Sequence, residues 1–144
     1  MSLAVCLQSH GLSQHLKQGL QALGKHTTCV EMRNRKATAS VDLDTALQTS
    51  APNAPRWDYG IEAMEGSQFT CVWIEVHPAT SSEVKTVLEK LRWLRGWLSQ
   101  SSTCRALTHQ FYWVATAAGV RIDTARQRQL ATAGLKMPKR RVSL

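Results

Sequence analysis

Alternating apolar and polar positions predict two neighbouring strands in the middle of the chain. Residues 69–77 are rich in β-branched and aromatic side chains, which favour strands. With a period of two, one face of this run carries Val72, Ile74 and Val76, and the other carries Cys71, Trp73, Glu75 and His77. Residues 57–63 alternate in the same way and place Asp58 and Glu62 on one side. Glu65-Gly66-Ser67 then predicts a hairpin turn between the two strands.

An apolar stripe of helical period follows and predicts a helix over residues 80–98. It consists of Val84, Val87, Leu88, Leu91, Leu94 and Leu98. Thr80 and Glu83 have the spacing of a capping box, and Pro78 should end the preceding strand because it has no N–H to donate. Trp93 and Trp97 lie one turn apart beside the stripe, as the edge of a core or as a patch for a homodimer or a protein partner.

The other segments complete an α/β pattern. Leucines at helical spacing predict a helix from Ser9 or Ser13 to Leu23, ended by Gly24. Strands are predicted over 27–32 and 37–43, joined by a basic turn at 33–36, and over 109–117, continuing at 119–122. Asp123 or Thr124 should begin a short last helix. We expect an α/β fold with a mixed β-sheet of four to six strands flanked by helices, the helix 80–98 on one face and the N-terminal helix nearby.

Composition is that of a globular protein. The 144 residues, 43% of them hydrophobic, predict a single domain over 1–144. No apolar run approaches the roughly 20 residues of a membrane span, and the N-terminus does not resemble a signal peptide, so we expect a cytoplasmic protein without a membrane partner. The four cysteines are widely spaced and form no CxxC pair, which favours reduced, buried thiols over a zinc site.

The net charge of +8 comes entirely from the second half of the chain. Residues 1–72 hold six basic and six acidic side chains, whereas residues 73–144 hold twelve and four. A one-sided basic excess is typical of proteins that bind polyanions, so nucleic acid is the expected partner. The candidate contacts are Arg92, Arg95, Arg126, Arg128, Lys139, Arg140 and Arg141. Residues 136–144 form either a terminal strand or a basic C-terminal tail.

Candidate chemistry lies on the two central strands. Asp58 stands at the start of the first, and Glu75 and His77 project from the end of the second. Carboxylates on adjacent strands supply the oxygen ligands that Mg²⁺ and Mn²⁺ prefer. A solvent-facing or ion-paired role for the same three side chains is the alternative.

The order of these residues resembles the core of the PD-(D/E)XK nuclease superfamily, which has a restriction-endonuclease-like fold. That core runs strand, strand, helix, strand, with an acid near the start of one strand and Glu-x-Lys on the next. Asp58 and Glu75-Val76-His77 fit this order, and the resemblance spans residues 41–120. Two positions differ from the pattern: Arg56-Trp57 separates Pro55 from Asp58, and His77 stands where the family has lysine.

The resemblance implies metal-assisted hydrolysis of phosphodiesters in nucleic acid. Asp58 and Glu75, with the Val76 carbonyl, would hold Mg²⁺ or Mn²⁺. His77 would replace the family lysine as a general base or a metal ligand, and Lys85 on the following helix is a candidate substitute for that lysine. A catalytically inactive relative that binds nucleic acid or a protein partner remains the alternative.

Overall fold

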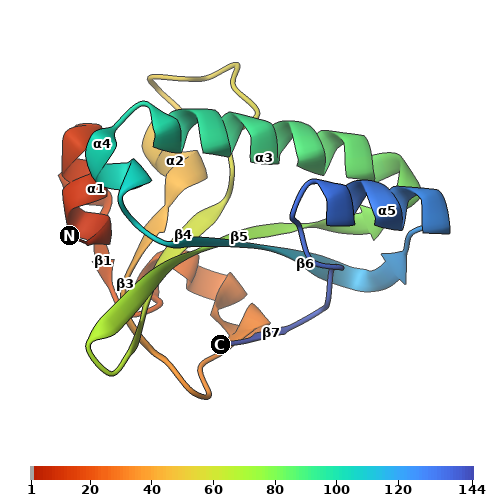
Figure 1. Cartoon of the computed structure of the whole chain (residues 1–144), viewed down its shortest axis with the longest axis horizontal. Coiled ribbons are helices and arrows are strands. Elements are labelled where there is room, and N and C mark those ends of the chain that lie inside the picture. The colour runs from red at the N-terminus through yellow and green to blue at the C-terminus, as the bar shows by residue number, and fades with distance from the viewer. Residues whose placement is uncertain (1) are drawn as a thin grey trace.

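A five-stranded mixed sheet forms the centre of the protein (Figure 1). The computed structural model describes residues 2–144, apart from the side chains of Ala117 and Ala118. The strand order is β1 (Lys17–Gln18), β3 (Lys36–Asp42), β4 (Tyr59–Glu65), β5 (Gln68–Thr80) and β6 (His109–Arg121). Neighbours are antiparallel from β1 to β5, whereas β5 and β6 are parallel. The predicted α/β class with a mixed sheet is confirmed.

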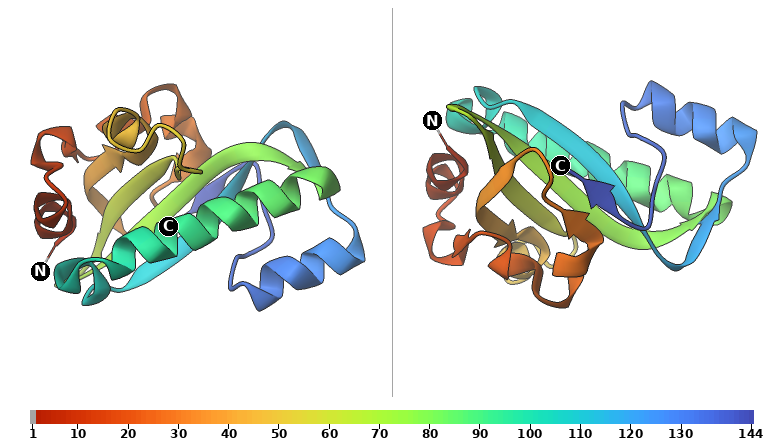
Figure 2. Two further views of the ribbon diagram at one scale, coloured as in Figure 1. Left: turned by 90° about the horizontal axis from the view of Figure 1, so that it is seen from above. Right: turned by 90° about the horizontal axis from the view of Figure 1, so that it is seen from below.

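Helices and a second small sheet cover the two faces of the central sheet. Helix α3 (Val84–Ser99) lies along one face, with α5 (Thr124–Thr132) beside it (Figure 2). The opposite face packs against the 3₁₀ helix η2 (Gln21–Cys29) and a parallel pair formed by β2 (Val30–Glu31) and β7 (Val142–Ser143). The remaining elements are α1 (Leu3–Ser9), η1 (Ser13–His15), α2 (Leu43–Leu47), η3 (Ser81–Glu83) and α4 (Ser102–Arg105). In residues 2–144, no helix combines the length and the apolar character needed to cross a membrane.

The alternation predicted for β5 separates two hydrophobic clusters. Val72 and Ile74 join the cluster under η2 and β7, whereas Cys71 and Trp73 join the cluster under α3. Gly60 of β4 pairs with Trp73, and a Cβ at position 60 would lie 2.5 Å from the indole ring. Glycine there is therefore a requirement for packing Trp73 against the sheet.

The prediction that Pro78 ends the strand is wrong. β5 continues to Thr80, and its register with β6 shifts between His77 and Ala79. The irregularity falls at the proline, where a ladder hydrogen bond cannot be donated, and pairing resumes beyond it. The strand therefore extends three residues past the end of its predicted alternation.

The predicted N-terminal helix from Ser9 or Ser13 to Leu23 is also wrong. The helix at this end is α1, and Gly11, with φ of 72°, turns the chain away after it. The leucines that suggested a helix lie in or at the ends of the 3₁₀ turns η1 and η2, and the two-residue edge strand β1 separates these turns. They contact both hydrophobic clusters, which a single helix would not do.

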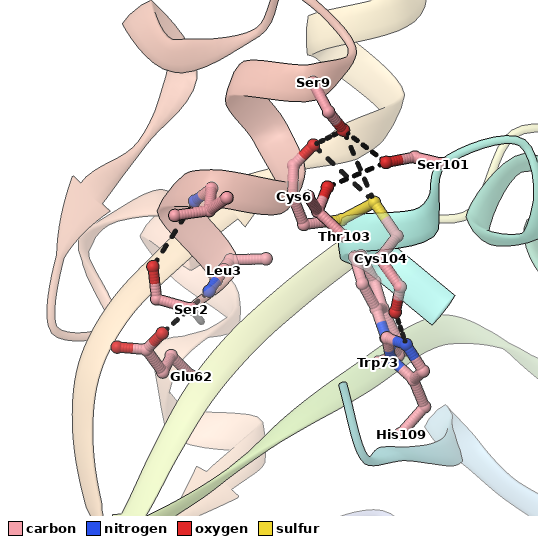
Figure 3. The surroundings of a disulfide bond; sticks show 11 residues. Ser2, Leu3, Cys6, Ser9, Glu62, Trp73, Ser101, Thr103, Cys104 and His109 are labelled. Carbon is pink, nitrogen blue, oxygen red and sulfur yellow. Dashed lines mark hydrogen bonds between the residues drawn. A yellow bond between two sulfur atoms is a disulfide. The ribbon is translucent and has the colours of Figure 1, made fainter. Parts of the chain in front are cut away.

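The expectation of four reduced thiols fails at one pair. Cys6 of α1 and Cys104 of α4 form a disulfide across a sequence separation of 98, whereas Cys29 and Cys71 are free. Figure 3 shows the two short helices side by side, with the Ser9 hydroxyl 2.7 Å from that of Ser101. The spacing of the cysteines in the sequence could not predict this disulfide, because α1 and α4 meet only in the folded chain.

The C-terminal segment ends in the two-residue strand β7, and its basic residues precede that strand. β7 pairs with β2, and the chain before it contacts the free edge of β6, where the Ala115 N–H donates to the Lys139 carbonyl at 2.8 Å. Val142 and Leu144 are buried. Of the two forms expected for residues 136–144, the structure has the strand.

Candidate active site

The antiparallel pairing of β4 with β5 brings Asp58 and Glu75 together, as predicted. Tyr59 pairs with Ile74, so Asp58 lies beside Glu75 at the end of the hairpin. The Asp58 N–H donates to Glu75 Oε1 at 3.2 Å, and the Val76 N–H donates to Asp58 Oδ2 at 2.9 Å. Each carboxylate is therefore fixed by the backbone next to the other.

Lys90 of α3 lies between the two carboxylates. Its Nζ forms an ion pair and hydrogen bond with Glu75 Oε2 and lies 3.9 Å from Asp58 Oδ1. The Glu75 side chain is fully buried, and those of Lys90 and Asp58 are 16% and 23% exposed. One ammonium thus faces two carboxylates in a largely buried site.

Sequence reasoning missed Lys90, although its position carried a signal. Lys90 follows Val87 by three residues and precedes Leu94 by four, so it borders the buried stripe of α3. Lys85, the predicted substitute for the family lysine, is exposed and lines a surface cavity with Ser81 and Ser82. The cation that contacts the carboxylates comes one and a half turns further along the same helix.

His77 extends the site toward the start of α3. Its Nε2 lies 2.8 Å from Glu83 Oε2 and its Nδ1 lies 3.5 Å from Glu75 Oε2. Hydrogen bonding to Glu75, and then to Glu83, raises the pKa of His77, while partial burial opposes that shift. The imidazole is consequently held between two acceptors. The backbone carbonyl of His77 accepts a hydrogen bond from Trp113 Nε1 at 3.0 Å.

The predicted capping box is wrong because Glu83 is engaged by His77. The Thr80 side chain makes no capping bond, and its hydroxyl lies 3.1 Å from that of Ser82. The 3₁₀ turn η3 precedes α3 and directs Glu83 toward the site. A residue expected to start a helix therefore positions a candidate catalytic side chain.

Asp58 has the most perturbed acidity in the site. Burial and the nearby Glu75 charge raise its pKa to about 7, although Lys90 and the Val76 N–H act in the opposite direction. The folded protein therefore favours the protonated form far more than the unfolded chain does. Ionisation of Asp58 removes stability as the pH rises from about 4 to about 7.

We predict that Asp58→Asn stabilises the protein at high pH. The amide stays neutral, so the free energy of unfolding should exceed that of the wild type by about 1–3 kcal/mol at pH 8, since one pKa unit is about 1.4 kcal/mol. At pH 4 the two proteins should differ little. Urea denaturation at both pH values in the absence of divalent cations measures the difference, and parallel pH profiles would contradict the prediction.

Glu62, the other acid predicted on the same side of its strand as Asp58, is engaged in hydrogen bonds that join neighbouring elements. Glu62 accepts from the Leu3 N–H and from the Thr38 hydroxyl, both at 2.8 Å, and so joins α1 and β3 to β4. In residues 2–144, no group of three or more His, Cys, Asp and Glu side chains has the arrangement of a metal centre. Any cation here would be bound through the Asp58 and Glu75 oxygens.

The predicted nucleic-acid contacts fall into separate clusters. Arg92 and Arg95 of α3 line one cavity with Ala133, and the Arg95 guanidinium stacks over Phe111 at 5.0 Å. Arg126 and Lys85 line a second cavity. Lys139 and Arg141 line a third with Lys136, and Arg128 and Arg140 are exposed. The pair Trp93 and Trp97 packs within the chain, with ring centroids 6.3 Å apart and Trp97 stacked on His10.

Comparisons of the chain with models of known families, with curated proteins and with solved structures found no match. Function is therefore inferred from the site itself. The candidate site consists of Asp58, Glu75, His77 and Lys90.

Proposed function

We propose that the protein is a Mg²⁺-dependent nuclease with a catalytic core like that of the PD-(D/E)XK superfamily. One observation carries the proposal: two carboxylates from adjacent strands and a lysine from the following helix meet in one buried site. The order of β4, β5, α3 and the parallel strand β6 also agrees with the order of elements in that core. Burying a carboxylate completely, with a second one beside it, is costly in free energy, and buried charges in proteins are paired or bind metal ions.

The donor set fits a hard divalent cation. One oxygen of Asp58 and one of Glu75 point toward the same place. The Lys90 ammonium, itself a cation, lies there. Those oxygens, with the Val76 carbonyl, would hold Mg²⁺ or Mn²⁺ after Lys90 Nζ moves aside. When bound, the cation would polarise a phosphodiester and lower the pKa of a water ligand.

The remaining side chains have roles that follow from their contacts. Lys90, displaced from between the carboxylates, stays within reach of a phosphate bound there and can balance the charge that develops on it. His77 can accept a proton on one ring nitrogen while Glu83 orients the other. In this assignment Lys90 supplies the positive charge that the family lysine provides, and His77 need not.

Phosphodiester hydrolysis in the presence of Mg²⁺ or Mn²⁺ tests the proposal. The wild type should degrade one or more of duplex DNA, single-stranded DNA and RNA, and Glu75→Gln should reduce the rate by about a hundredfold or more. Glu89→Gln makes the same chemical change on the exposed side of α3 and should leave the rate unchanged. Equal loss in both variants, or activity that EDTA does not remove, would contradict the assignment.

The alternative is an inactive module that binds nucleic acid or a protein partner. Its specific support is that the Lys90 ammonium lies between the two carboxylates and forms an ion pair with the buried Glu75. In that case the wild type would shift nucleic acid on a gel at low salt and yet hydrolyse none of the substrates with either cation.

A further inference from the structure

A basic cavity lies at the outer edge of the sheet, separate from Asp58 and Glu75. It has a volume of about 190 Å³ and lies where the chain leading to β7 contacts the free edge of β6. Its lining consists of Tyr112, Trp113, Lys136, Met137, Lys139, Arg141, Val142 and Ser143. A water molecule takes up about 30 Å³ of liquid, so the cavity has room for a larger ligand.

Three cations of this lining form no close ion pair, although Arg141 lies near enough to Glu31 to lower the pKa of that carboxyl. In the part of the chain that the structure describes, no carboxylate forms an ion pair with Lys136, Lys139 or Arg141. The segment 124–144 contains no acidic residue at all. Concentrated positive charge in a concave site attracts an anion and raises its local concentration.

The geometry of the cavity is set by the fold. The Lys139 carbonyl accepts from the Ala115 N–H at 2.8 Å, and buried Val142 anchors the chain beyond Arg141. Lys136 Nζ lies 5.0 Å from the centre of the Tyr112 ring and 3.4 Å from its hydroxyl. Two lysines and an arginine thus line one cavity, and their N–H groups suit the several oxygens of a phosphate. The Ser143 hydroxyl donates to Glu31 Oε2 and the Tyr112 hydroxyl to Gln110 Oε1, both at 3.4 Å.

Trp113 connects the cavity with the candidate active site. It lines the cavity, pairs in register with Glu75 across β5 and β6, and donates through its indole N–H to the His77 carbonyl. Neighbouring strands lie about 4.8 Å apart, so β6, which borders the cavity, lies one strand from Glu75 and two strands from Asp58. A single extended polyanion can therefore contact both.

We propose that this cavity binds a phosphate group of a nucleic-acid strand. The identity of the ligand rests on the proposed function, whereas the affinity for phosphate follows from the cavity alone. A strand held by one phosphate at Lys136, Lys139 and Arg141 would have its position relative to Asp58 and Glu75 fixed.

Binding of inorganic phosphate at constant ionic strength, followed by calorimetry, tests the site. Lys139→Gln/Arg141→Gln should weaken phosphate binding at least tenfold. Lys25→Gln/Lys36→Gln removes the same charge from exposed positions outside the cavity and should change binding less than twofold. Equal weakening in the two double variants, or none in either, would overturn the proposal.

Oligonucleotides identify the source of the phosphate. If the cavity takes a strand end, a 5′-phosphorylated oligomer should bind the wild type more tightly than its 5′-hydroxyl form, and the cavity variant should lose that difference. If it takes an internal phosphate, both oligomers should weaken equally in the cavity variant. Oligomer binding that is unchanged in this variant would overturn the nucleic-acid assignment even if phosphate binds.

Two further measurements separate this inference from the nuclease proposal. Glu75→Gln should retain phosphate affinity, because Glu75 does not line the cavity. In the wild type, phosphate should slow acetylation of Lys136 and Lys139 but not of exposed Lys85, and uniform labelling of all three would contradict the site without requiring any variant to fold. A protein that binds phosphate here and hydrolyses nothing would refute the nuclease proposal alone.

Discussion

Replacement of Lys90 by methionine should destabilise the protein by about 3 kcal/mol, because it leaves the fully buried Glu75 without its cation. This is a large part of the 5–15 kcal/mol that typically separates folded from unfolded states. Methionine retains most of the packing volume, so the loss reports on charge. Urea denaturation in EDTA at pH 8 gives the difference.

Two variants serve as controls for the change at Lys90. Lys85→Met alters an exposed lysine of the same helix and should shift the free energy of unfolding by less than about 0.5 kcal/mol. Adding Glu75→Gln to Lys90→Met removes the unpaired charge and should recover most of the lost stability. If the double variant is as unstable as the single one, the ion pair is not the source of the effect.

The same variant also separates a metal site from a structural ion pair. With Lys90 gone, Mg²⁺ or Mn²⁺ is the cation that can lie between Asp58 and Glu75, so either metal should raise the stability of Lys90→Met more than that of the wild type. At a concentration of 100 times Kd the gain is about 2.7 kcal/mol. No response to either metal would favour the inactive module over the nuclease.

Sequence patterns predicted the acidic part of the site because that part is local. Period-two alternation and a tight turn suffice to place Asp58 and Glu75 on adjacent strands and on the same face of the sheet. Lys90 and Glu83 were not assigned to the site because their roles depend on how α3 and η3 lie over that face. The helical period places Lys90 at the border of the apolar stripe of α3. It does not show which carboxylates of the sheet Lys90 contacts.

The ends of the chain were harder to predict because their partners are remote in sequence. Val30 pairs with Val142, and Lys139 contacts Val114, in arrangements that no local period encodes. The strand predicted over residues 27–32 is reduced to two residues, and it does not form the expected hairpin with β3. Long-range pairing decides these segments, and packing against both hydrophobic clusters decides residues 12–23, whose leucine spacing suggested a helix.

The disulfide between Cys6 and Cys104 is the other large contribution to stability that we expect. It closes a loop across a separation of 98 residues, and restricting a chain of that length in the unfolded state is worth up to about 4.7 kcal/mol. Both cysteines are fully buried between α1 and α4, so packing around them resists reduction of the native protein. Without the bond, only side-chain contacts such as Ser9 with Ser101 join the two helices.

Reduction of the disulfide should therefore lower the free energy of unfolding by about 2–5 kcal/mol. Thermal denaturation with and without dithiothreitol measures the effect, which should appear as a fall of about 6–20 °C in the midpoint for a chain of this size. Cys6→Ser/Cys104→Ser has no bond to reduce, so its midpoint should be close to that of the reduced wild type both with and without dithiothreitol. Cys29→Ser changes a free thiol and should respond to reductant as the wild type does. A wild-type midpoint that reductant does not move, after thiol counting confirms complete reduction, would mean that the cross-link adds nothing to the packing of α1 against α4.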